Sequence, residues 1–364
     1  MKILYVDPMS RNNLGIYDKN LLKNIEPCMI YFFCNKDFQF DKIGEVNIIK
    51  EYEYNRKKHI FKIFSYVKSQ YNLYKFAKEN KISIIHFQWL KIPVLDFLLI
   101  KLLQGKGIKI VLTAHNLLPH DSGEKYFKIY KKIYKTLDRI IVHAQNTKLE
   151  LEKIFFLDAQ KINVIPHGLL ELLNKSTSKN FSLRNCDKEI IFSLVGALNS
   201  YKGVDILIEA WSKIEESDKI KLVIAGAGKI NFSKIEKMKN VVIINRFLTD
   251  EELNEILEET DVAILPYRKI SQSGVLLTAL NKKIPVIVSN IGGLVQPFEL
   301  GNVGWIVDNI NEKNLCDVIN KVIKNKNKIN EIKNNRVLWT SIEEYYSWEK
   351  IGKKTYKLYI DILS

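Results

Sequence analysis

Two polar turns that contain glycine have the residue types of an anion site. The turn "NSYKG" (199–203) places Lys202 directly before an apolar helical run, and "SQSG" (271–274) opens a second such run. The first N–H groups of a helix have no partner inside the helix and attract anions. A lysine adds a full positive charge suited to phosphate. Two such turns indicate a diphosphate site; a solvated lysine and simple N-capping by Ser273 are the alternatives.

Histidines supply the other candidate chemistry. His115 directly follows the apolar run 108–113, so it could hydrogen-bond a substrate hydroxyl or be a structural residue. His167 also follows an apolar run and could reach a ligand, whereas we expect His86 and His143 to be structural. The histidines show no metal-ligand spacing and no Asp-x-Asp pair is present, so we expect no metal in the site. A Walker A sequence is also missing, which argues against a P-loop NTPase.

The elements that must position these residues alternate between strand and helix patterns. Short runs rich in Ile, Val and Leu, bounded by turn residues, predict buried parallel strands, and the longer periodic runs between them predict helices. The pattern predicts α/β domains with helices on both faces of each sheet. The strands are expected in 2–8, 82–90, 108–116, 138–145, 162–168, 189–198, 220–228, 240–247, 261–267, 284–290 and 304–308, and the helices in 16–25, 93–107, 123–137, 203–214, 249–260 and 274–281.

A polar segment without periodicity interrupts this alternation and suits a linker. We therefore expect two doubly wound domains, 1–172 and 189–342, joined by a linker at 173–188 and followed by a helical, aromatic-rich segment at 343–364. Ligands of open α/β sheets bind beyond the carboxyl ends of the strands. The chemistry is accordingly expected in the loops that follow strands.

The charge distribution indicates an anionic partner for the first half of the chain, such as membrane lipid, polyphosphate or nucleic acid; a merely soluble basic surface is the alternative. Residues 1–180 carry +13 of the net +15. Lysines alternate with aromatic residues in 55–76 and 126–137, as in helices that lie on anionic lipid; ordinary surface helices with an aromatic core face are the alternative. No apolar run is long enough to span a membrane, and the start lacks the features of a signal peptide. No nucleic-acid-binding module is visible, so we expect no nucleic-acid partner.

Six segments in order resemble the retaining glycosyltransferases of family 4, which have the GT-B fold. The segment "GALNSYKGVDILIEAW" (196–211) is similar to the family's "GRL…KG…LI.A", and "PVIVSNIGGL" (285–294) is similar to its "PVVA…GG". The other similar segments are "LVIAGAG" (222–228), 240–267, "LTAHNLLPH" (112–120) and "YSWEKIGKKTYKLY" (346–359). The resemblance covers nearly the whole chain. It implies two Rossmann-like domains facing a cleft, with the terminal helix packing back on the first domain.

The resemblance also implies the roles of particular residues. Lys202 would hold the diphosphate of a nucleotide-sugar donor, with help from the backbone around Ser273 and Gly274. His115 would lie beside the transferred sugar, and these two residues are the expected catalytic ones. Gly15, in the loop after the first strand, would lie near the donor phosphates. No cofactor is expected besides the nucleotide-sugar co-substrate.

The chain departs from the family at the donor turn. Ile270 and Thr278 stand where the family usually has two glutamates, which contact the sugar and the nucleotide ribose, and Ala197 replaces an arginine. The stretch "QSGVLLTAL" resembles a branch of the family from surface-polysaccharide synthesis. In that branch Gln272 and Ser273 offer neutral hydrogen bonds in place of a carboxylate. Thr278 is counted with them as donor-binding.

The resemblance thus implies transfer of a sugar, with retention, to a glycan or lipid-linked acceptor in bacterial surface-polysaccharide synthesis. A catalytically inactive GT-B scaffold or sugar-nucleotide-binding protein is the alternative that the missing glutamates motivate. Another GT-B activity, such as epimerisation, is a further one. We expect a cytoplasmic protein, with the inner face of the cytoplasmic membrane as an alternative location.

Overall fold

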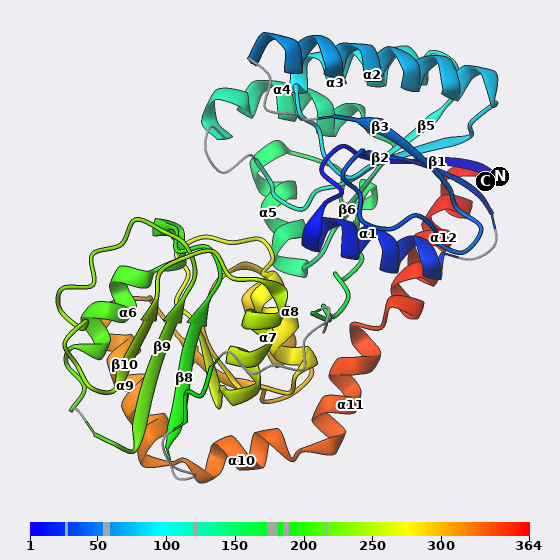
Figure 1. Ribbon diagram of the computed structural model, residues 1–364. Coiled ribbons are helices and arrows are strands. Elements are labelled where there is room, and N and C mark those ends of the chain that lie inside the picture. Colours follow the sequence, from blue (N-terminus) through cyan, green and yellow to red (C-terminus); the bar gives the residue numbers. More distant parts are fainter. Residues whose placement is uncertain (26–27, 54–58, 119–122, 173–180, 185–188, 216) are drawn as a thin grey trace. The chain divides into compact units, whose positions relative to one another are not determined.

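A computed structural model of the 364-residue chain describes all residues except 26–27, 54–58, 119–122, 173–180, 185–188 and 216. The described residues form two compact units. The first comprises Met1–Gly168 and Tyr346–Ser364, and the second comprises Leu169–Tyr345. Each unit holds one parallel sheet with helices on both faces, so the predicted α/β fold with two doubly wound domains is confirmed (Figure 1).

The first unit is built on a seven-stranded sheet of order β3-β2-β1-β4-β5-β6-β7. All of its strand pairs are parallel, which requires a crossover between consecutive strands and buries both faces. The strands are β1 (Lys2–Asp7), β2 (Met29–Asn35), β3 (Asn47–Tyr52), β4 (Ile84–Phe87), β5 (Lys109–Thr113), β6 (Arg139–Val142) and β7 (Ile162–Val164).

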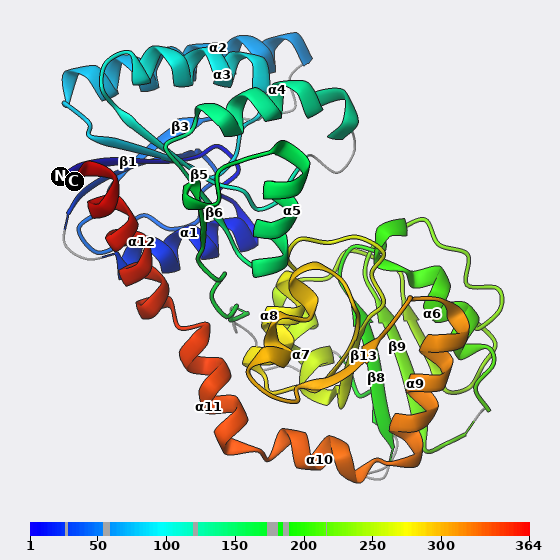
Figure 2. The ribbon, with the colours of Figure 1, turned by 180° about the vertical axis from the view of Figure 1, so that it is seen from behind.

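Helices cover both faces of this sheet (Figures 1 and 2). Their apolar side chains pack against it. One face packs against α2 (His59–Glu79), α3 (Pro93–Gln104), α4 (Gly123–Thr136) and α5 (Gln145–Phe155). The other face packs against α1 (Asn12–Asn24) and α12 (Trp348–Leu363). The helix that ends the chain is therefore part of the first unit, although it follows the second unit in the sequence.

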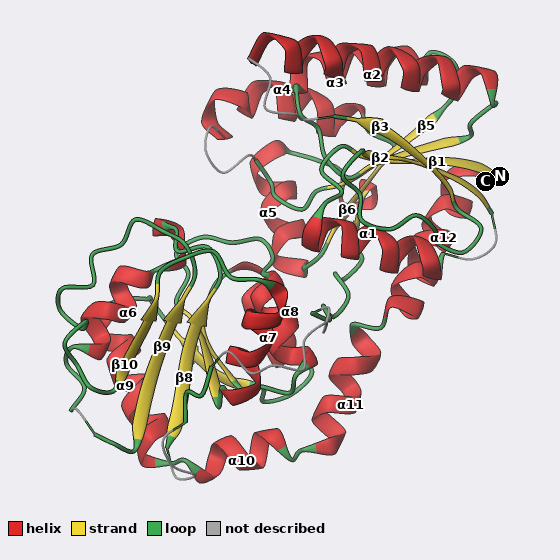
Figure 3. Cartoon of the chain, in the orientation of Figure 1, coloured by secondary structure: helices red, strands yellow, loops and turns green. Residues whose placement is uncertain are grey.

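The second unit has a six-stranded parallel sheet of order β10-β9-β8-β11-β12-β13. Its strands are β8 (Ile190–Val195), β9 (Ile220–Ala225), β10 (Val241–Ile244), β11 (Val262–Leu265), β12 (Val286–Ser289) and β13 (Gly304–Val307). Its helices are α6 (Val204–Trp211), α7 (Asp250–Glu259), α8 (Gly274–Asn281), α9 (Glu312–Lys324), α10 (Asn327–Lys333) and α11 (Arg336–Tyr345) (Figure 3). The helices α6 and α9 share an apolar core with one face of the sheet.

In both sheets, successive strands are added first on one side and then on the other side of the first strand of the unit. In the first unit the resulting switch point lies between β1 and β4, and in the second it lies between β8 and β11. The loops that leave two such strands run to opposite sides of the sheet, so they open a crevice at the carboxyl ends of the strands. These two crevices are where the fold can hold ligands.

The structure corrects several sequence-based predictions. Gly15, expected in the loop after the first strand, lies in the first turn of α1, because that helix begins at Asn12. The strands β2 and β3 and the helices α5, α9 and α10 were not predicted. The final helical segment is two helices, α11 and α12, separated at Tyr346–Ser347. The predicted linker 173–188 lies outside the described residues except for 181–184.

Candidate functional site

The loop that carries Lys202 is tied to the end of the neighbouring strand β11. Gly203 has φ +64°, and a side chain there would collide with the carbonyl group of Pro266. Arg268 donates from its backbone N–H to the carbonyl oxygen of Tyr201 at 2.7 Å, and from its guanidinium to that of Ser200 at 2.7 Å. Only glycine permits this backbone conformation and close approach. The loop is thereby held at the switch point of the second sheet, just before α6.

Lys202 is a buried cation. Its side chain is only 7% exposed, and burial lowers the pKa of its ammonium group to about 8. Its Nζ lies 5.4 Å from the centroid of the Tyr267 ring, and within the described part of the chain it has no acidic or hydrogen-bonding partner. A buried charge without a partner is unfavourable, so an anion entering here would gain an unusually strong contact.

The start of α8 lies beside this lysine. A β-carbon at Gly196 would be 2.9 Å from Nζ of Lys202 and 3.4 Å from the side chain of Val275 in the first turn of α8. Ser273 caps the helix, since its hydroxyl accepts the N–H of Leu276 at 3.3 Å. The hydroxyl of Tyr267 also hydrogen-bonds to Ser273. The structure therefore brings Lys202 and the helix start together, as both turns suggested.

The "GG" turn after β12 supports this helix start. Gly292 has φ +49°, and a side chain there would collide with the carbonyl group of Ile270. The N–H of Gly293 donates to the carbonyl oxygen of Ser271 at 3.1 Å. These contacts define the path of the turn 270–274, so the pair Gly292–Gly293 has a structural role.

The remaining predicted donor residues, Gln272, Gly274 and Thr278, differ in their accessibility. The hydroxyl of Thr278 donates to the carbonyl oxygen of Gly274 at 3.0 Å within α8, and its side chain is buried. A β-carbon at Gly274 would lie 3.3 Å from Leu170. Gln272 is partly exposed, and its side-chain oxygen accepts the N–H of Ser273 at 3.2 Å. Thus Gln272 remains available to a ligand, and Thr278 is turned into its own helix.

A hollow of about 1100 Å³ lies beside the Lys202 loop. Residues 198–201 and 228–231 line it, and Lys202 does not. Its Arg268 is paired with Asp205 at 2.6 Å, and its Lys234 is paired with Glu209 at 2.6 Å. Cations that are already neutralised bind an added anion weakly, and the third cation of the hollow, Lys229, is exposed to water and salt, which screen its charge. The buried Lys202 is therefore the better anion site of this unit.

At the carboxyl edge of the first sheet, four histidines and several polar side chains form a buried cluster. His115 follows β5, as predicted, and both of its ring nitrogens have protein partners. Its Nε2 lies 2.9 Å from Oε1 of Gln88, and its Nδ1 lies 3.1 Å from Nε2 of His143. His167 stands beside this pair, with its ring centroid 5.4 Å from that of His143. Burial and the neighbouring imidazoles lower the pKa of His115 well below its usual value.

His115 borders a cavity of about 440 Å³ in the first unit. Trp89 stacks on the His115 ring with 5.0 Å between centroids and 10° between planes. The indole N–H of Trp89 is buried and has no hydrogen-bond partner among the described residues. An oxygen-bearing ligand would satisfy this donor. The cavity is lined by Met9, Gln88–Lys91, Pro93, Leu112–Asn116, Leu118, Tyr126, Tyr130 and Tyr134.

A pair of buried carboxyl groups beside this cluster was not predicted. Asp7 ends β1 and Asp18 lies in α1, and both side chains are almost completely buried. Burial raises the pKa of Asp7 to about 6, and burial together with the charge of Asp7 raises the pKa of Asp18 well above its usual value. Two carboxyl groups in contact hold at least one proton between them near neutral pH. An aspartate at the end of a strand was the only sequence signal for this pair.

Family comparisons cover most of the chain. Residues 30–169 match the family Glycosyltransferase Family 4, and residues 175–338 match the family Glycosyl transferases group 1. The two matches fall on the first and second units.

Curated relatives share about a quarter of their residues with the chain. The O-antigen biosynthesis glycosyltransferase WclY of Escherichia coli is 26% identical over 77% of this chain and 84% of its own length. The E. coli UDP-Gal:alpha-D-GlcNAc-diphosphoundecaprenol alpha-1,3-galactosyltransferase is 28% identical over 62% of each chain. The uncharacterized glycosyltransferase MJ1607 of Methanocaldococcus jannaschii is 27% identical over 66% of this chain. The aligned region spans 64% of MJ1607, slightly less than two thirds of its length.

Solved structures show the same fold. The crystal structure of Anabaena HepE in complex with UDP-glucose superposes with a TM-score of 0.75 at 14% identity, and it covers 99% of both chains. At this identity the similarity concerns the fold alone.

Proposed function

Because the chain belongs to the glycosyl transferases group 1, with a Glycosyltransferase Family 4 domain in its first unit, we propose that it transfers a sugar from a nucleotide-diphosphate sugar to a hydroxyl group of an acceptor. The observation that carries the proposal is the buried, unpaired Lys202 beside the start of α8. Such a site matches the charge of a diphosphate. UDP is the first donor nucleotide to test, because it is named for the galactosyltransferase relative and the HepE complex.

In the proposed reaction the bond between the anomeric carbon and the diphosphate breaks as the acceptor oxygen bonds to that carbon. Negative charge grows on the leaving diphosphate, and Lys202 with the N–H groups at the start of α8 would stabilise it. A leaving phosphate oxygen would accept the proton of the acceptor hydroxyl. We infer retention of the anomeric configuration and a site that works without a metal ion; within the described residues, no three metal-ligating side chains are placed to hold one.

The acceptor is proposed to be a lipid-linked glycan of bacterial surface-polysaccharide synthesis. The names of the two E. coli relatives support this class, since one makes O-antigen and the other acts on a diphosphoundecaprenol-linked sugar. The cavity beside His115 supports it as well. Aromatic rings such as Trp89 and Tyr126 suit the apolar faces of a sugar, and the unpaired indole N–H suits its oxygen atoms.

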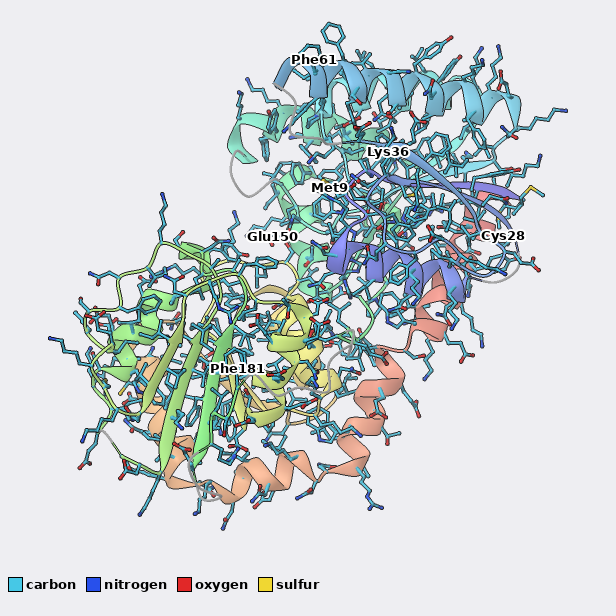
Figure 4. All side chains as sticks on the ribbon, in the orientation of Figure 1. Met9, Cys28, Lys36, Phe61, Glu150 and Phe181 are labelled. Carbon is cyan, nitrogen blue, oxygen red and sulfur yellow. The ribbon has the colours of Figure 1, made fainter. Side chains whose placement is uncertain are left out.

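We further propose that the protein works in the cytoplasm at the inner face of the membrane, held there by a surface that we name the α2–α3 face. No helix in the described ranges is both long and apolar enough to cross a membrane. The two helices lie side by side on the outside of the first unit (Figures 1 and 2), and Figure 4 labels Phe61 near the beginning of α2. The α2–α3 face comprises Phe61, Phe64, Val67 and Tyr71 of α2 and Val94, Leu98 and Leu102 of α3, each 43–67% exposed.

The lysines around this face fit anionic lipid. Lys62, Lys68 and Lys101 are exposed on the same two helices, and the only acidic residues there are the buried Asp96 and Glu79 at the end of α2. In α4, by contrast, the apolar side packs in the core and no large apolar side chain is exposed. Of the two segments expected to lie on lipid, 55–76 therefore supports the proposal, and 126–137 is an ordinary amphipathic helix.

Calorimetric titration of the protein with UDP, GDP, ADP and CMP in the presence of EDTA tests the donor site. We expect one nucleoside diphosphate to bind, and Lys202→Met to weaken its binding about 10- to 100-fold, because a hydrogen bond to a charged group contributes about 1.5–3 kcal/mol. Binding is also expected to weaken as the pH rises through about 8, where Lys202 loses its proton. Lys237→Met is the control, because Lys237 is exposed and does not line the 1100 Å³ hollow beside the Lys202 loop.

The outcomes separate the hypotheses. Equal affinity of wild type and Lys202→Met would remove Lys202 from the site, and no binding of any nucleotide would overturn the donor site. Binding without transfer from any nucleotide sugar to lipid-linked acceptors would favour the inactive scaffold. Where transfer occurs, the anomeric proton coupling of the product decides between retention and inversion.

A further inference from the structure

A continuous chain of buried hydrogen bonds runs from α12 to His115 inside the first unit. The hydroxyl of Tyr359 lies 2.6 Å from Nδ1 of His86. The Nε2 of His86 lies 2.7 Å from Oγ1 of Thr113 and 3.0 Å from the side-chain nitrogen of Gln88. The same Gln88 amide reaches His115 at 2.9 Å. All of these residues except His115 are at most 1% exposed, so bulk water does not reach them.

The far end of this chain of hydrogen bonds is anchored on a backbone carbonyl group. The Nδ1 of His143 lies 2.9 Å from the carbonyl oxygen of Ile165, which can only accept a hydrogen bond. His143 must therefore carry a proton on Nδ1. Burial lowers its pKa to about 4, so the ring is neutral near pH 7 and its Nε2 is an acceptor. The facing nitrogen, Nδ1 of His115, must then be the donor in the 3.1 Å contact between the two rings.

This assignment leaves a lone pair on Nε2 of neutral His115. This lone pair and the amide oxygen of Gln88 are both acceptors, so they cannot hydrogen-bond to each other. In the neutral state the Gln88 amide is therefore rotated by half a turn, and its NH₂ group points to His115. The amide oxygen then accepts Nε2–H of His86, and Nδ1 of His86 accepts the Tyr359 hydroxyl. Every donor in this chain of hydrogen bonds then has an acceptor. The other amide orientation, with Oε1 toward Nε2, is satisfied only when the His115–His143 pair takes up one more proton.

We propose that His143 and Gln88 are positioning residues that hold His115 as the neutral Nδ1–H tautomer, with Tyr359 supporting Gln88 through His86. The NH₂ group of Gln88 then occupies Nε2, the one acceptor of the His115 ring, and a sugar hydroxyl at the 440 Å³ cavity, which both residues line, would donate to Nε2 in place of that NH₂ group. This inference rests on the proposed function, in which His115 lies beside the transferred sugar. It specifies which kind of group on the substrate the histidine recognises: a hydroxyl that donates its proton to Nε2.

NMR of the full-length protein labelled with ¹⁵N-histidine tests the tautomer without any substrate. The ¹⁵N shifts distinguish the two neutral tautomers from the doubly protonated ring, and His115→Asn identifies the His115 signals. We expect Nδ1–H, neutral, at pH 7.5. In Gln88→Glu the carboxylate can only accept, so we expect His115 to become doubly protonated at the same pH, while Gln88→Met leaves it neutral. The other titratable groups facing the His115 ring, His86, His143, His167 and Tyr17, are unchanged in both variants.

Kinetic measurements with the nucleotide-sugar donor identified by calorimetry test the positioning role of Gln88 and Tyr359. We expect kcat of Gln88→Glu to fall at least 10-fold at pH 7 and to recover as the pH rises, because the doubly protonated ring cannot accept. Gln88→Met should lower kcat several-fold without a new pH dependence. Tyr359→Phe should also lower kcat several-fold, and the control Tyr356→Phe, one turn earlier on α12, should not change it.

An Nε2–H or doubly protonated His115 in the wild type would overturn the proposal, as would identical His115 signals or pH profiles in Gln88→Glu and Gln88→Met. A failure of the proposed function is distinguishable from these results. The NMR signals would then show the expected tautomer while no nucleotide sugar is turned over.

Discussion

At the scale of single residues, the fold has removed ionisable groups from water in both units. Lys202 is buried without a counter-charge among the described residues, and Asp7 and Asp18 are buried against each other. Burial disfavours the charged form in each case, so it lowers the pKa of the lysine and raises the pKa of the carboxyl groups. Such groups cost folding free energy at pH values where they must be charged. We infer that Lys202 is kept for its anion, and the carboxyl pair gives a testable dependence of stability on pH.

Replacing Asp18 by asparagine is expected to stabilise the protein at alkaline pH. The folded-state pKa values of the pair are raised, so its contribution to stability is complete below about pH 4 and is lost as the pH rises through about 6 and beyond. The amide of the Asp18→Asn variant does not titrate, and its oxygen can still accept the Tyr5 hydroxyl, which Asp18 accepts at 2.8 Å. The gain is expected to be on the order of 1–2 kcal/mol at pH 8 and to shrink toward pH 5.

Thermal unfolding of both proteins between pH 5 and pH 8 measures this effect. The exposed Asp37→Asn, which also removes one carboxylate near α1, serves as the control and should show no such trend. A constant difference between wild type and Asp18→Asn across this range would show that the pair does not hold an extra proton in the folded state.

At the scale of elements, the beginning of α8 combines a structural and a chemical task. Ser273 caps the helix, and the first turn of α8 lies close to Lys202. Aspartate is as good an N-cap as serine, but its charge repels an anionic ligand. Substitution at this one position therefore separates the two tasks.

We expect Ser273→Asp to keep the stability of the protein and to weaken nucleoside diphosphate binding at least 10-fold. Ser273→Ala is expected to lose about 1 kcal/mol of stability, because the N–H of Leu276 loses its acceptor, and to change binding much less. Chemical denaturation and calorimetric titration of the two variants measure these effects. Undiminished binding by Ser273→Asp would place the diphosphate away from this helix start.

At the scale of the whole molecule, charge and exposed apolar area are both unevenly distributed. Residues 1–180 carry most of the net charge of +15, and the α2–α3 face lies within the same half of the chain. Apolar insertion and attraction to anionic lipid reinforce each other in peripheral membrane proteins. This combination supports the proposed membrane attachment over a merely basic, soluble surface.

Sedimentation with lipid vesicles tests the attachment. We expect binding to vesicles that contain about 30% phosphatidylglycerol, weaker binding in high salt because of screening, and little binding to pure phosphatidylcholine. The double substitution Phe61→Ser with Phe64→Ser should weaken binding about 10-fold or more. Leu149→Ser, which removes an exposed apolar side chain from α5, is the control. Unchanged binding of the double variant would exclude the α2–α3 face as the attachment surface.

The sequence by itself determined the architecture and the two helix starts of the proposed anion site, because both depend on local patterns. Short β-branched runs alternate with amphipathic ones, and this pattern predicted most strands and the division into two parallel sheets. Lys202 and Ser273 lie next to helix starts, a local feature that the spacing of glycine and apolar residues reveals. The strands β2 and β3 were missed, and Gly15 was placed in a loop, because the signals at those boundaries were weak.

Only the tertiary structure decided how side chains from distant segments act on one another. His86, His115 and His143 come from three different strands or strand ends, and Tyr359 comes from the last helix of the chain. Parallel strand order places the strand ends at one edge, and the packing of α12 on the same sheet adds the tyrosine. Hydrogen-bond partners and burial, which define tautomers and pKa values, depend on these long-range contacts. Nothing in the spacing of the residues encodes them.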